Sequence, residues 1–197
     1  IRDPEMSRGL GDVYKRQETC RMSDIKNYHS EEHSLSNGQV LMRNYSFDEA
    51  LVIVREMTDN LVLDLFEKGL VTSSLTLWIA YDHRYEHEAS KGTVKLERES
   101  NSSKKIIDAV EDLYLRIADR YTGIRRIEVC ANRVAPESYV QYSLFDDPKQ
   151  TDKERHLQEA VLNVKQRYGK NAIMRGSNLL ECSTYRERNE QIGGHRA

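Results

Sequence analysis

Hydrophobic and polar residues follow two different periodicities between residues 34 and 134. Four stretches alternate in the manner of half-buried strands, at residues 39–45, 75–81, 94–97 and 124–134. Two longer stretches repeat apolar residues at helical spacing, one behind Ser46 and one behind the serine-rich residues 100–103. The pattern therefore predicts the order β-α-β-β-α-β.

Both predicted helices carry local start and stop signals. Ser46 and Glu49 form a capping box, and Lys68-Gly69 ends the first helix with a cation and a glycine. The apolar stripe of the second helix is Ile106, Val110, Leu113 and Ile117, and Gly123 follows it. We expect an α+β domain over residues 34–134, the split βαβ arrangement of ferredoxin-like domains, in which a four-stranded sheet carries both helices on one face.

The two ends of the chain have a different character. Residues 1–17 predict a disordered arm, and residues 7–17 also resemble translated adaptor sequence, so a natural and an artefactual origin both stay open. Residues 135–150 read as an extended linker, residues 151–168 as an amphipathic helix opened by a capping box of Thr151 and Glu154, and the rest as an irregular polar tail. The sequence does not decide whether this tail helix folds back on the domain or docks onto a partner.

Composition narrows the function classes. The 197 residues carry a formal net charge of -2, so the chain as a whole is not an overall basic nucleic-acid binder. The sequence has no apolar run long enough to span a bilayer and no secretory signal, so we expect no membrane partner. Three widely spaced cysteines (Cys20, Cys130 and Cys182) indicate neither a disulfide scaffold nor a zinc site and favour a reducing cytoplasm.

Charge is unevenly distributed over the predicted elements. Acidic residues gather on the two helices, whereas the strands and their connecting loop carry a basic set: Arg43, Lys91, Lys95, Arg98, Arg125 and Arg126. Because strand side chains alternate, Lys95 and Arg126 are expected to point away from the helices. Such an open face could hold phosphates without reading bases, although an ordinary solvated face fits the same pattern.

Three short stretches in collinear order carry a family resemblance. They are Ser34-Leu35-Ser36-Asn37-Gly38-Gln39-Val40-Leu41, Gly69-Leu70-Val71-Thr72 and Ile124-Arg125-Arg126-Ile127. The region resembles the little-finger domain of Y-family translesion DNA polymerases, in particular the UmuC-like branch. Residues 18–33 resemble that family's linker from thumb to little finger, and residues 187–195 its C-terminal signature.

The resemblance implies a role in DNA repair and damage bypass within the SOS response. The family's little finger lies against primer-template duplex DNA and holds it mainly through backbone phosphates. Ser34, Ser36 and Gly38 match first-strand positions that meet phosphates, and Arg125 and Arg126 match a pair of arginines that contacts the template strand. Gln39 stands where some relatives carry arginine, so phosphate binding by the first strand is expected to be weaker or less salt-dependent here. The implied location is the cytoplasm, in association with the nucleoid.

Catalysis is expected to reside elsewhere in the parent protein. The family transfers nucleotides with palm-domain carboxylates that hold two Mg²⁺ ions, and these precede the little finger. Asp146-Asp147 lies in the predicted linker, and no strand-borne acid cluster is apparent in the sequence. We therefore expect no catalytic residue and no cofactor in this chain, which would not be an enzyme by itself.

A pentapeptide in the linker suggests a second partner. Gln141-Tyr142-Ser143-Leu144-Phe145 resembles the peptide that binds the bacterial sliding clamp, with Gln141, Leu144 and Phe145 as the contact residues. Such a segment fills a preformed pocket with its two apolar side chains. The alternative is that Leu144 and Phe145 pack back on the domain.

Other candidate sites are weaker. His83 and His87 lie in a predicted loop without a third ligand at useful spacing, so metal binding is not expected. Trp78 on the sheet face could stack on a base, but packing is the simpler role. Cys130 forms no recognisable nucleophile arrangement with a histidine. The alternative for the whole chain is a ferredoxin-like protein-interaction module that does not bind nucleic acid.

Overall fold

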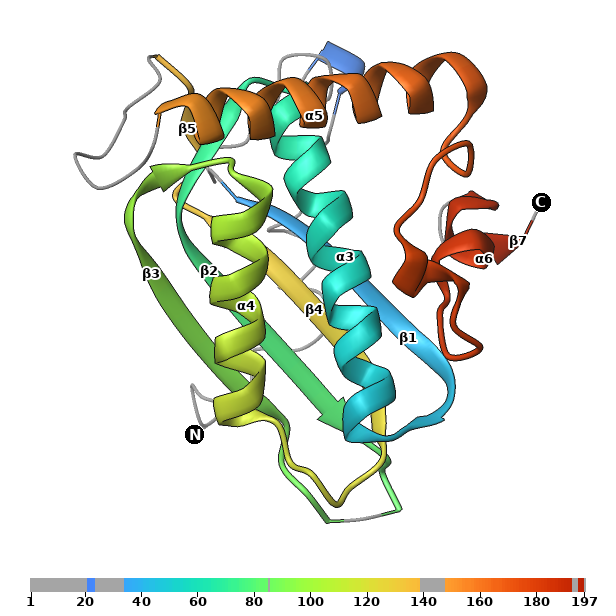
Figure 1. Cartoon of the computed structure of the whole chain (residues 1–197). Coiled ribbons are helices and arrows are strands. Elements are labelled where there is room, and N and C mark those ends of the chain that lie inside the picture. The colour runs from blue at the N-terminus through green and yellow to red at the C-terminus, as the bar shows by residue number, and fades with distance from the viewer. Residues whose placement is uncertain (1–20, 24–33, 85, 139–147, 193–194, 197) are drawn as a thin grey trace, which may run out of the picture. The chain divides into compact units, whose positions relative to one another are not determined.

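The computed structural model describes residues 21–23, 34–84, 86–138, 148–192 and 195–196. The chain divides into two units, Ile1–Glu32 and His33–Ala197, and the architecture below is that of the second. Its elements in order are β1 (Leu35–Tyr45), α3 (Phe47–Glu67), β2 (Leu70–Tyr81), β3 (Ser90–Ser100), α4 (Ser103–Ile117) and β4 (Ile124–Asn132). Helices α3 and α4 lie on one face of the sheet (Figure 1). The predicted α+β class and the β-α-β-β-α-β order are confirmed.

The strands pair in the order β1-β4-β2-β3, and every neighbouring pair is antiparallel. Each β-α-β crossover is therefore split by a third strand, as expected, with β4 between β1 and β2, and β2 between β3 and β4. Strand β5 (Ala135–Pro136) pairs with the start of β2, so the predicted linker begins as an addition to the sheet. Strands β1 and β3 form the two edges of the main sheet.

Helix α3 begins and ends where the sequence signals predict. The Ser46 hydroxyl accepts a hydrogen bond from the Glu49 backbone N–H at 3.4 Å, and the Glu49 carboxylate accepts one from the Ser46 N–H at 3.0 Å. Lys68 closes the helix, and Gly69 follows with φ at 61°, a left-handed conformation that suits glycine. The capping box is confirmed.

The core lies between the sheet and the two helices. It combines the predicted helical stripes with the inward residues of the strands; its fully buried members include Ile53, Met57, Leu61, Leu75, Leu77, Ile79, Ile106, Ile124 and Ile127. Tyr114 of α4 is buried as well, and its hydroxyl donates to the backbone oxygen of Phe47 at 2.8 Å. This bond links the two helices inside the core.

Three strands are longer than their hydrophobic patterns predict. β1 begins at Leu35, β2 begins at Leu70, and β3 covers Ser90–Ser100. The added stretches pair with neighbouring strands but carry polar residues such as Ser36 and Thr72. Backbone pairing extends these strands beyond their alternating segments, and the added stretch of β2 also buries Val71.

Helix α5 (Pro148–Tyr168) begins before the predicted start, and the predicted capping box of Thr151 and Glu154 is wrong. The Glu154 carboxylate instead reaches the start of α4, where it accepts hydrogen bonds from the Ser102 hydroxyl at 2.8 Å and the Lys104 N–H at 2.9 Å. Arg155 forms a two-point ion pair with Glu137, with distances of 2.7 and 2.9 Å. The helix folds back across one end of the helical layer (Figure 1).

The tail after α5 is irregular, as predicted, but it packs on the domain. It contains a short 3₁₀ turn η1 (Gly176–Leu179), α6 (Tyr185–Asn189), and the pair β6 (Gln191–Ile192) and β7 (His195–Arg196). Tyr185 is 1% exposed, and Arg175 forms an ion pair with Asp59 of α3 at 2.7 Å. The buried Glu56 carboxylate of α3 accepts hydrogen bonds from the Ser183 hydroxyl and, at 3.3 Å, from the Thr184 N–H.

Candidate nucleic-acid interface

The sheet face opposite the helices is the candidate binding surface. Burial alternates along β1, so that Ser36, Gly38 and Val40 are exposed whereas Leu41 is buried on the helix side. In the sheet register Ser36 pairs with Cys130, Gly38 with Glu128, and Val40 with Arg126. The outward positions of β1 and β4 therefore form one continuous surface, which we call the open face.

Strands β2 and β3 continue the open face. Thr76 and Trp78 of β2 are level with Thr93 and Lys91 of β3, and Lys95 is level with Ser74. The Thr76 hydroxyl lies 2.9 Å from that of Thr93 and accepts a hydrogen bond from the Asn132 side-chain amide at 2.8 Å. Hydroxyls and amides thus cross three strands and can bond to phosphate oxygens without reading a base.

A β-bulge places Arg125 and Arg126 side by side. The register shifts between Val40 and Tyr45 on β1 and between Ala80 and Tyr81 on β2, in both cases opposite Arg125. Ile124 and Ile127 on either side are fully buried. An extra residue in a strand lets two consecutive side chains leave the same face. Simple alternation predicts an outward side chain only for Arg126.

The Arg126 side chain contacts two residues of the open face, Trp78 of β2 and Glu128 of β4. Its guanidinium lies 5.1 Å from the ring centroid of Trp78, within the range of a cation–π contact. It also lies 3.5 Å from the Glu128 carboxylate, and both side chains are partly exposed. Trp78 therefore supports an arginine on the sheet surface.

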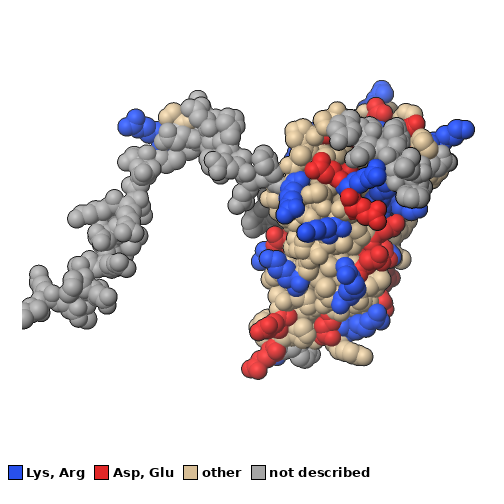
Figure 2. All heavy atoms as spheres, turned by 90° about the vertical axis from the view of Figure 1, so that its left-hand side faces the viewer, with Lys and Arg blue, Asp and Glu red and all other residues tan. Residues whose placement is uncertain are grey.

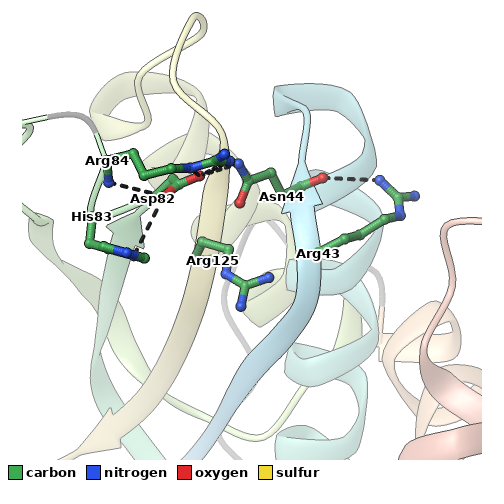
Figure 3. Close-up of a pocket in the computed structure, with 6 residues that line it drawn as sticks. All are labelled: Arg43, Asn44, Asp82, His83, Arg84 and Arg125. Carbon is green, nitrogen blue, oxygen red and sulfur yellow. Dashed lines mark hydrogen bonds and ion pairs between the residues drawn. The ribbon is translucent and has the colours of Figure 1, made fainter.

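Arg125 reaches a shallow pocket of about 430 Å³ at one end of the sheet. The other lining residues are Arg43 and Asn44 from β1 and Asp82, His83 and Arg84 from the end of β2. Arg125 lies in the middle of this group (Figure 3). No hydrogen bond or ion pair of Arg125 is found within the described part of the chain, so its charge is available to a ligand.

Asp82 is the carboxylate in this pocket, and its charge is already compensated. It accepts from the Arg84 N–H at 3.0 Å, the Arg84 Nε at 2.8 Å and the Asn44 amide. The Arg84 guanidinium, followed by the Arg84 backbone N–H and the Asn44 amide, holds the pKa of Asp82 far below its usual range. Arg43 in turn is paired with Glu49 at 2.6 Å. The pocket therefore retains the positive charge of Arg125.

Sequence patterns did not indicate which residues line this pocket together with Arg125. Asn44, Asp82 and Arg84 come from the end of one strand and from a polar loop that has no periodicity of its own. The signal available in the sequence was the Ile-Arg-Arg-Ile stretch, because two successive polar residues between buried ones interrupt alternation.

Most of the predicted DNA-contact residues share the open face, but Gln39 does not. Ser34, Ser36, Gly38, Lys95 and Arg126 are exposed, and Arg125 is half-buried. The Gln39 side chain lies on the helix side, where its oxygen accepts from the Thr184 hydroxyl at 3.1 Å and from Arg188 at 3.3 Å. We therefore remove Gln39 from the set, because its place in the alternation of β1 turns it toward the tail.

The surface charge is mixed. Seen from the β3 edge, basic and acidic side chains are interspersed without a continuous patch of one sign (Figure 2). On the open face, Glu97 and Glu128 offset part of the charge of Lys91, Lys95, Arg125 and Arg126. A grip built on this face would be modest in strength.

The other candidates have structural roles or remain unplaced. Among the described residues no three His, Cys, Asp or Glu side chains are placed to hold a metal ion. The His87 ring contacts the Tyr81 ring in a tilted arrangement, with ring centroids 4.3 Å apart and ring planes inclined by 59°. The Cys130 thiol lies 3.3 Å from the Asn132 side-chain oxygen, and burial raises its pKa. The predicted clamp-contact residues Gln141, Leu144 and Phe145 lie outside the described residues. No helix in the described ranges could cross a membrane.

A family model described as the impB/mucB/samB family C-terminal domain matches residues 32–144, which is more than half of the chain. The chain belongs to this family. The resemblance to the little finger of Y-family DNA polymerases is thereby confirmed, whereas the assignment to the UmuC-like branch stays a prediction.

Curated relatives of this impB/mucB/samB domain carry the name DNA polymerase IV 2. The protein of that name from Bacillus subtilis is 25% identical over 164 residues, which cover 82% of this chain and 39% of the relative. The one from Halalkalibacterium halodurans is 21% identical over 168 residues, covering 85% of this chain and 40% of the relative. The chain thus spans about two fifths of the length of these relatives.

Solved structures of related domains are more distant. A complex of a β-clamp processivity factor with the little-finger domain of PolIV aligns at a TM-score of 0.41 and 12% identity, covering 58% of this chain and all of that chain. A chimeric Y-family polymerase aligns at a TM-score of 0.40 and 17% identity, covering 55% of this chain and 30% of that chain. Because both TM-scores are below 0.5, the fold of this impB/mucB/samB domain is defined by the strand order and contacts of the chain itself.

Proposed function

We propose that this chain is the C-terminal part of a Y-family translesion DNA polymerase of the bacterial cytoplasm. In this proposal the open face holds the sugar-phosphate backbone of primer-template DNA during damage bypass. The remaining three fifths of a relative-sized protein would supply the palm carboxylates, their Mg²⁺ ions and nucleotidyl transfer. We assign the catalytic steps to that part of the parent protein, and DNA binding to this chain.

The β-bulge at Arg125 is the observation that carries the proposal. It sets two guanidinium groups on the surface that also presents Ser36, the Gly38 backbone and Lys95. Guanidinium groups, hydroxyls and backbone amides are the groups with which proteins hold phosphates, and they carry no base specificity. That property suits a polymerase that must accept distorted bases.

Salt dependence tests the surface directly. If Lys91, Lys95, Arg125 and Arg126 each neutralise a phosphate, a log-log plot of affinity against salt has a slope of about -3.6 for duplex DNA. Replacing Arg125 and Arg126 together by Ala should reduce the magnitude of that slope by about 1.8 and weaken binding at low salt. The measurement is fluorescence anisotropy of labelled primer-template DNA over a salt series.

A matched control removes the same charge from the other face. Lys104 and Arg116 are exposed on α4, so their double replacement by Ala changes the net charge equally without touching the open face. We expect this control to change the slope by less than the arginine pair does. Equal slopes in the parent and in the Arg125→Ala/Arg126→Ala variant would show that the assigned surface is wrong.

We also propose that Gln141, Leu144 and Phe145 bind the sliding clamp. The support is the resemblance of the pentapeptide and its position in the chain, between β5 and α5. Replacing Leu144 and Phe145 by Ala should abolish capture by purified clamp, because both apolar contacts are lost. Replacing Tyr142 and Ser143, the variable pair, should leave capture intact.

The protein-interaction alternative makes a different prediction for the same samples. A chain that binds clamp but not primer-template DNA, even at low salt, would favour an interaction module. The mixed surface charge makes this comparison necessary, because net charge alone does not require DNA binding. Gel shift on primer-template DNA with and without clamp provides it.

A further inference from the structure

Glu128 lies near the centre of the open face, on the inner strand β4. It pairs in register with Gly38 of β1 on one side and with Trp78 of β2 on the other. A Cβ atom built on Gly38 would lie 3.5 Å from the Glu128 Cγ, so the Glu128 side chain extends over the glycine. A negative charge thus sits among the residues proposed to hold phosphates.

The Arg126 guanidinium contacts both Glu128 and Trp78. The Arg126 Nη2 lies 3.5 Å from the Glu128 Oε2, and the guanidinium carbon lies 5.1 Å from the Trp78 ring centroid. A phosphate that accepts a hydrogen bond from the Arg126 Nη2 would meet the Glu128 carboxylate at the same donor atom. Arg125, one residue away, has no such carboxylate partner within the described residues.

We propose that Glu128 sets the strength of DNA binding by competing with phosphate for Arg126. This inference rests on the proposed function of the open face. A phosphate must displace the carboxylate or accept its repulsion, so Glu128 keeps the affinity low and penalises a poorly placed phosphate. A weak contact of this kind can be released as the duplex advances through the enzyme.

A positioning role for Glu128 predicts the opposite change in DNA affinity. If Glu128 merely held Arg126 in position for DNA, removing its charge would weaken binding. If it competes, Glu128→Gln should bind primer-template DNA about fivefold more tightly at low salt, a change of ~1 kcal/mol. The salt slope of Glu128→Gln should reach the full value of about -3.6, whereas competition should leave the slope of the parent smaller in magnitude by up to about 0.9, because Glu128 already neutralises part of the Arg126 charge.

Glu159 provides the matched control. It is exposed on α5, which packs on the helical layer and contributes no residue to the open face. Glu159→Gln removes the same charge from the other side of the domain and should change the affinity less than twofold.

A double-mutant cycle separates competition for Arg126 from general repulsion. Measured in an Arg126→Ala background, the Glu128→Gln change should lose most of its fivefold gain. A gain that persists there, a Glu128→Gln variant no tighter than Glu159→Gln, or weaker binding would each overturn the proposal. Trp78 is the single tryptophan of the chain, so its fluorescence reports whether DNA reaches this cluster in every variant.

Failure of the proposed function is recognisable in the same experiment. If the parent, Glu159→Gln and Glu128→Gln chains all leave DNA unbound at low salt, the open face does not bind DNA and the proposed role of Glu128 is refuted as well. If the parent binds with the expected salt slope and Glu128→Gln is unchanged, only the competition is refuted. Thermal unfolding of each variant confirms that the conservative substitutions leave the fold intact.

Discussion

The contact between β3 and α4 depends on a glycine, and adding one methyl group there should destabilise the domain. A Cβ on Gly92 would lie 2.8 Å from the Leu113 Cδ1 and 3.1 Å from the Ile117 Cγ2. Leu113 is 2% exposed and cannot move away without disturbing the core. Gly92 therefore sets how closely the edge strand approaches the helix.

The expected magnitude combines two opposing effects. Overpacking in a well-packed core costs about 1–3 kcal/mol, whereas replacing glycine by alanine stabilises by about 0.4–1 kcal/mol through the unfolded chain. Gly92→Ala should therefore lower the free energy of unfolding by about 1–2 kcal/mol. Urea denaturation followed by circular dichroism measures this change directly.

Gly176→Ala is the matched control, because nothing lies within 4 Å of the added Cβ there. This variant should keep the stability of the parent or exceed it slightly, since only the effect on the unfolded chain remains. If Gly92→Ala proves as stable as Gly176→Ala, α4 does not pack against β3 at this distance, and the described packing is wrong.

Three further predictions test other parts of the fold. Arg155→Ala should lower the free energy of unfolding, measured by urea titration, by about 1–2 kcal/mol. The reason is that the substitution leaves the shielded Glu137 carboxylate without its two-point partner. As a control, Gln166→Ala removes an exposed contact to Glu67 and should change the free energy of unfolding by less than about 0.5 kcal/mol. The Arg43 guanidinium, with the Ser46 N–H, lowers the pKa of Glu49 from 4.5 to about 2, so its stabilisation is complete above pH 4.5 and is lost as pH falls toward 2. Acid titration of unfolding should show a contribution of at most about 1 kcal/mol, since the pair is partly exposed, and Glu49→Gln should remove it. Tyr114→Phe should cost about 1 kcal/mol in thermal or urea unfolding because it deletes a buried hydrogen bond, whereas Tyr121→Phe, at a residue 96% exposed, should have no measurable effect.

Local signals predicted the elements, and non-local pairing decided their arrangement. The cap at Ser46 and the apolar stripes of both helices appear in the structure as predicted, because they depend on residues within a turn or two of one another. The strand order β1-β4-β2-β3 depends on pairing between segments tens of residues apart, for which hydrophobic periodicity carries no information. The same limitation explains the short predictions for β1 and β2, whose polar ends are ordered by their partners.

In the candidate site too, local alternation predicted some residue positions, whereas positions that depend on non-local pairing were not predicted. Alternation placed Lys95 and Arg126 outward, and both are exposed. It could not place Arg125, which depends on a bulge, or the pairing of Asp82 with Asn44 and Arg84, which joins two distant segments. Gln39 shows the opposite error, because a position taken from family resemblance lies on the helix side of its strand.

The tail was the least predictable part, for a physical reason. Its contacts with the domain are ion pairs and hydrogen bonds rather than an apolar stripe, as between Arg175 and Asp59 or between Thr184 and Glu56. Polar contacts of this kind leave no periodic pattern, so the sequence predicted only an irregular polar tail after residue 168, although Tyr185 is fully buried. For the helix at residues 151–168 the sequence left folding back and docking onto a partner open, and the contacts of α5 with α4 and Glu137 favour folding back.

Ion pairs decide where positive charge remains available on the molecule. Three arginines that reach the helices are bound to carboxylates: Arg55 to Glu111, Arg175 to Asp59, and Arg43 to Glu49. On the open face, Arg125 has no carboxylate partner among the described residues, and Arg126 shares a partly exposed one with solvent. A polyanion gains most where a cation is not already neutralised, because it then displaces no existing partner. Arg116 of α4 is also exposed without a carboxylate partner in the described ranges, so the open face is distinguished by two adjacent arginines that lie beside hydroxyls and amides, and not by the net charge of -2.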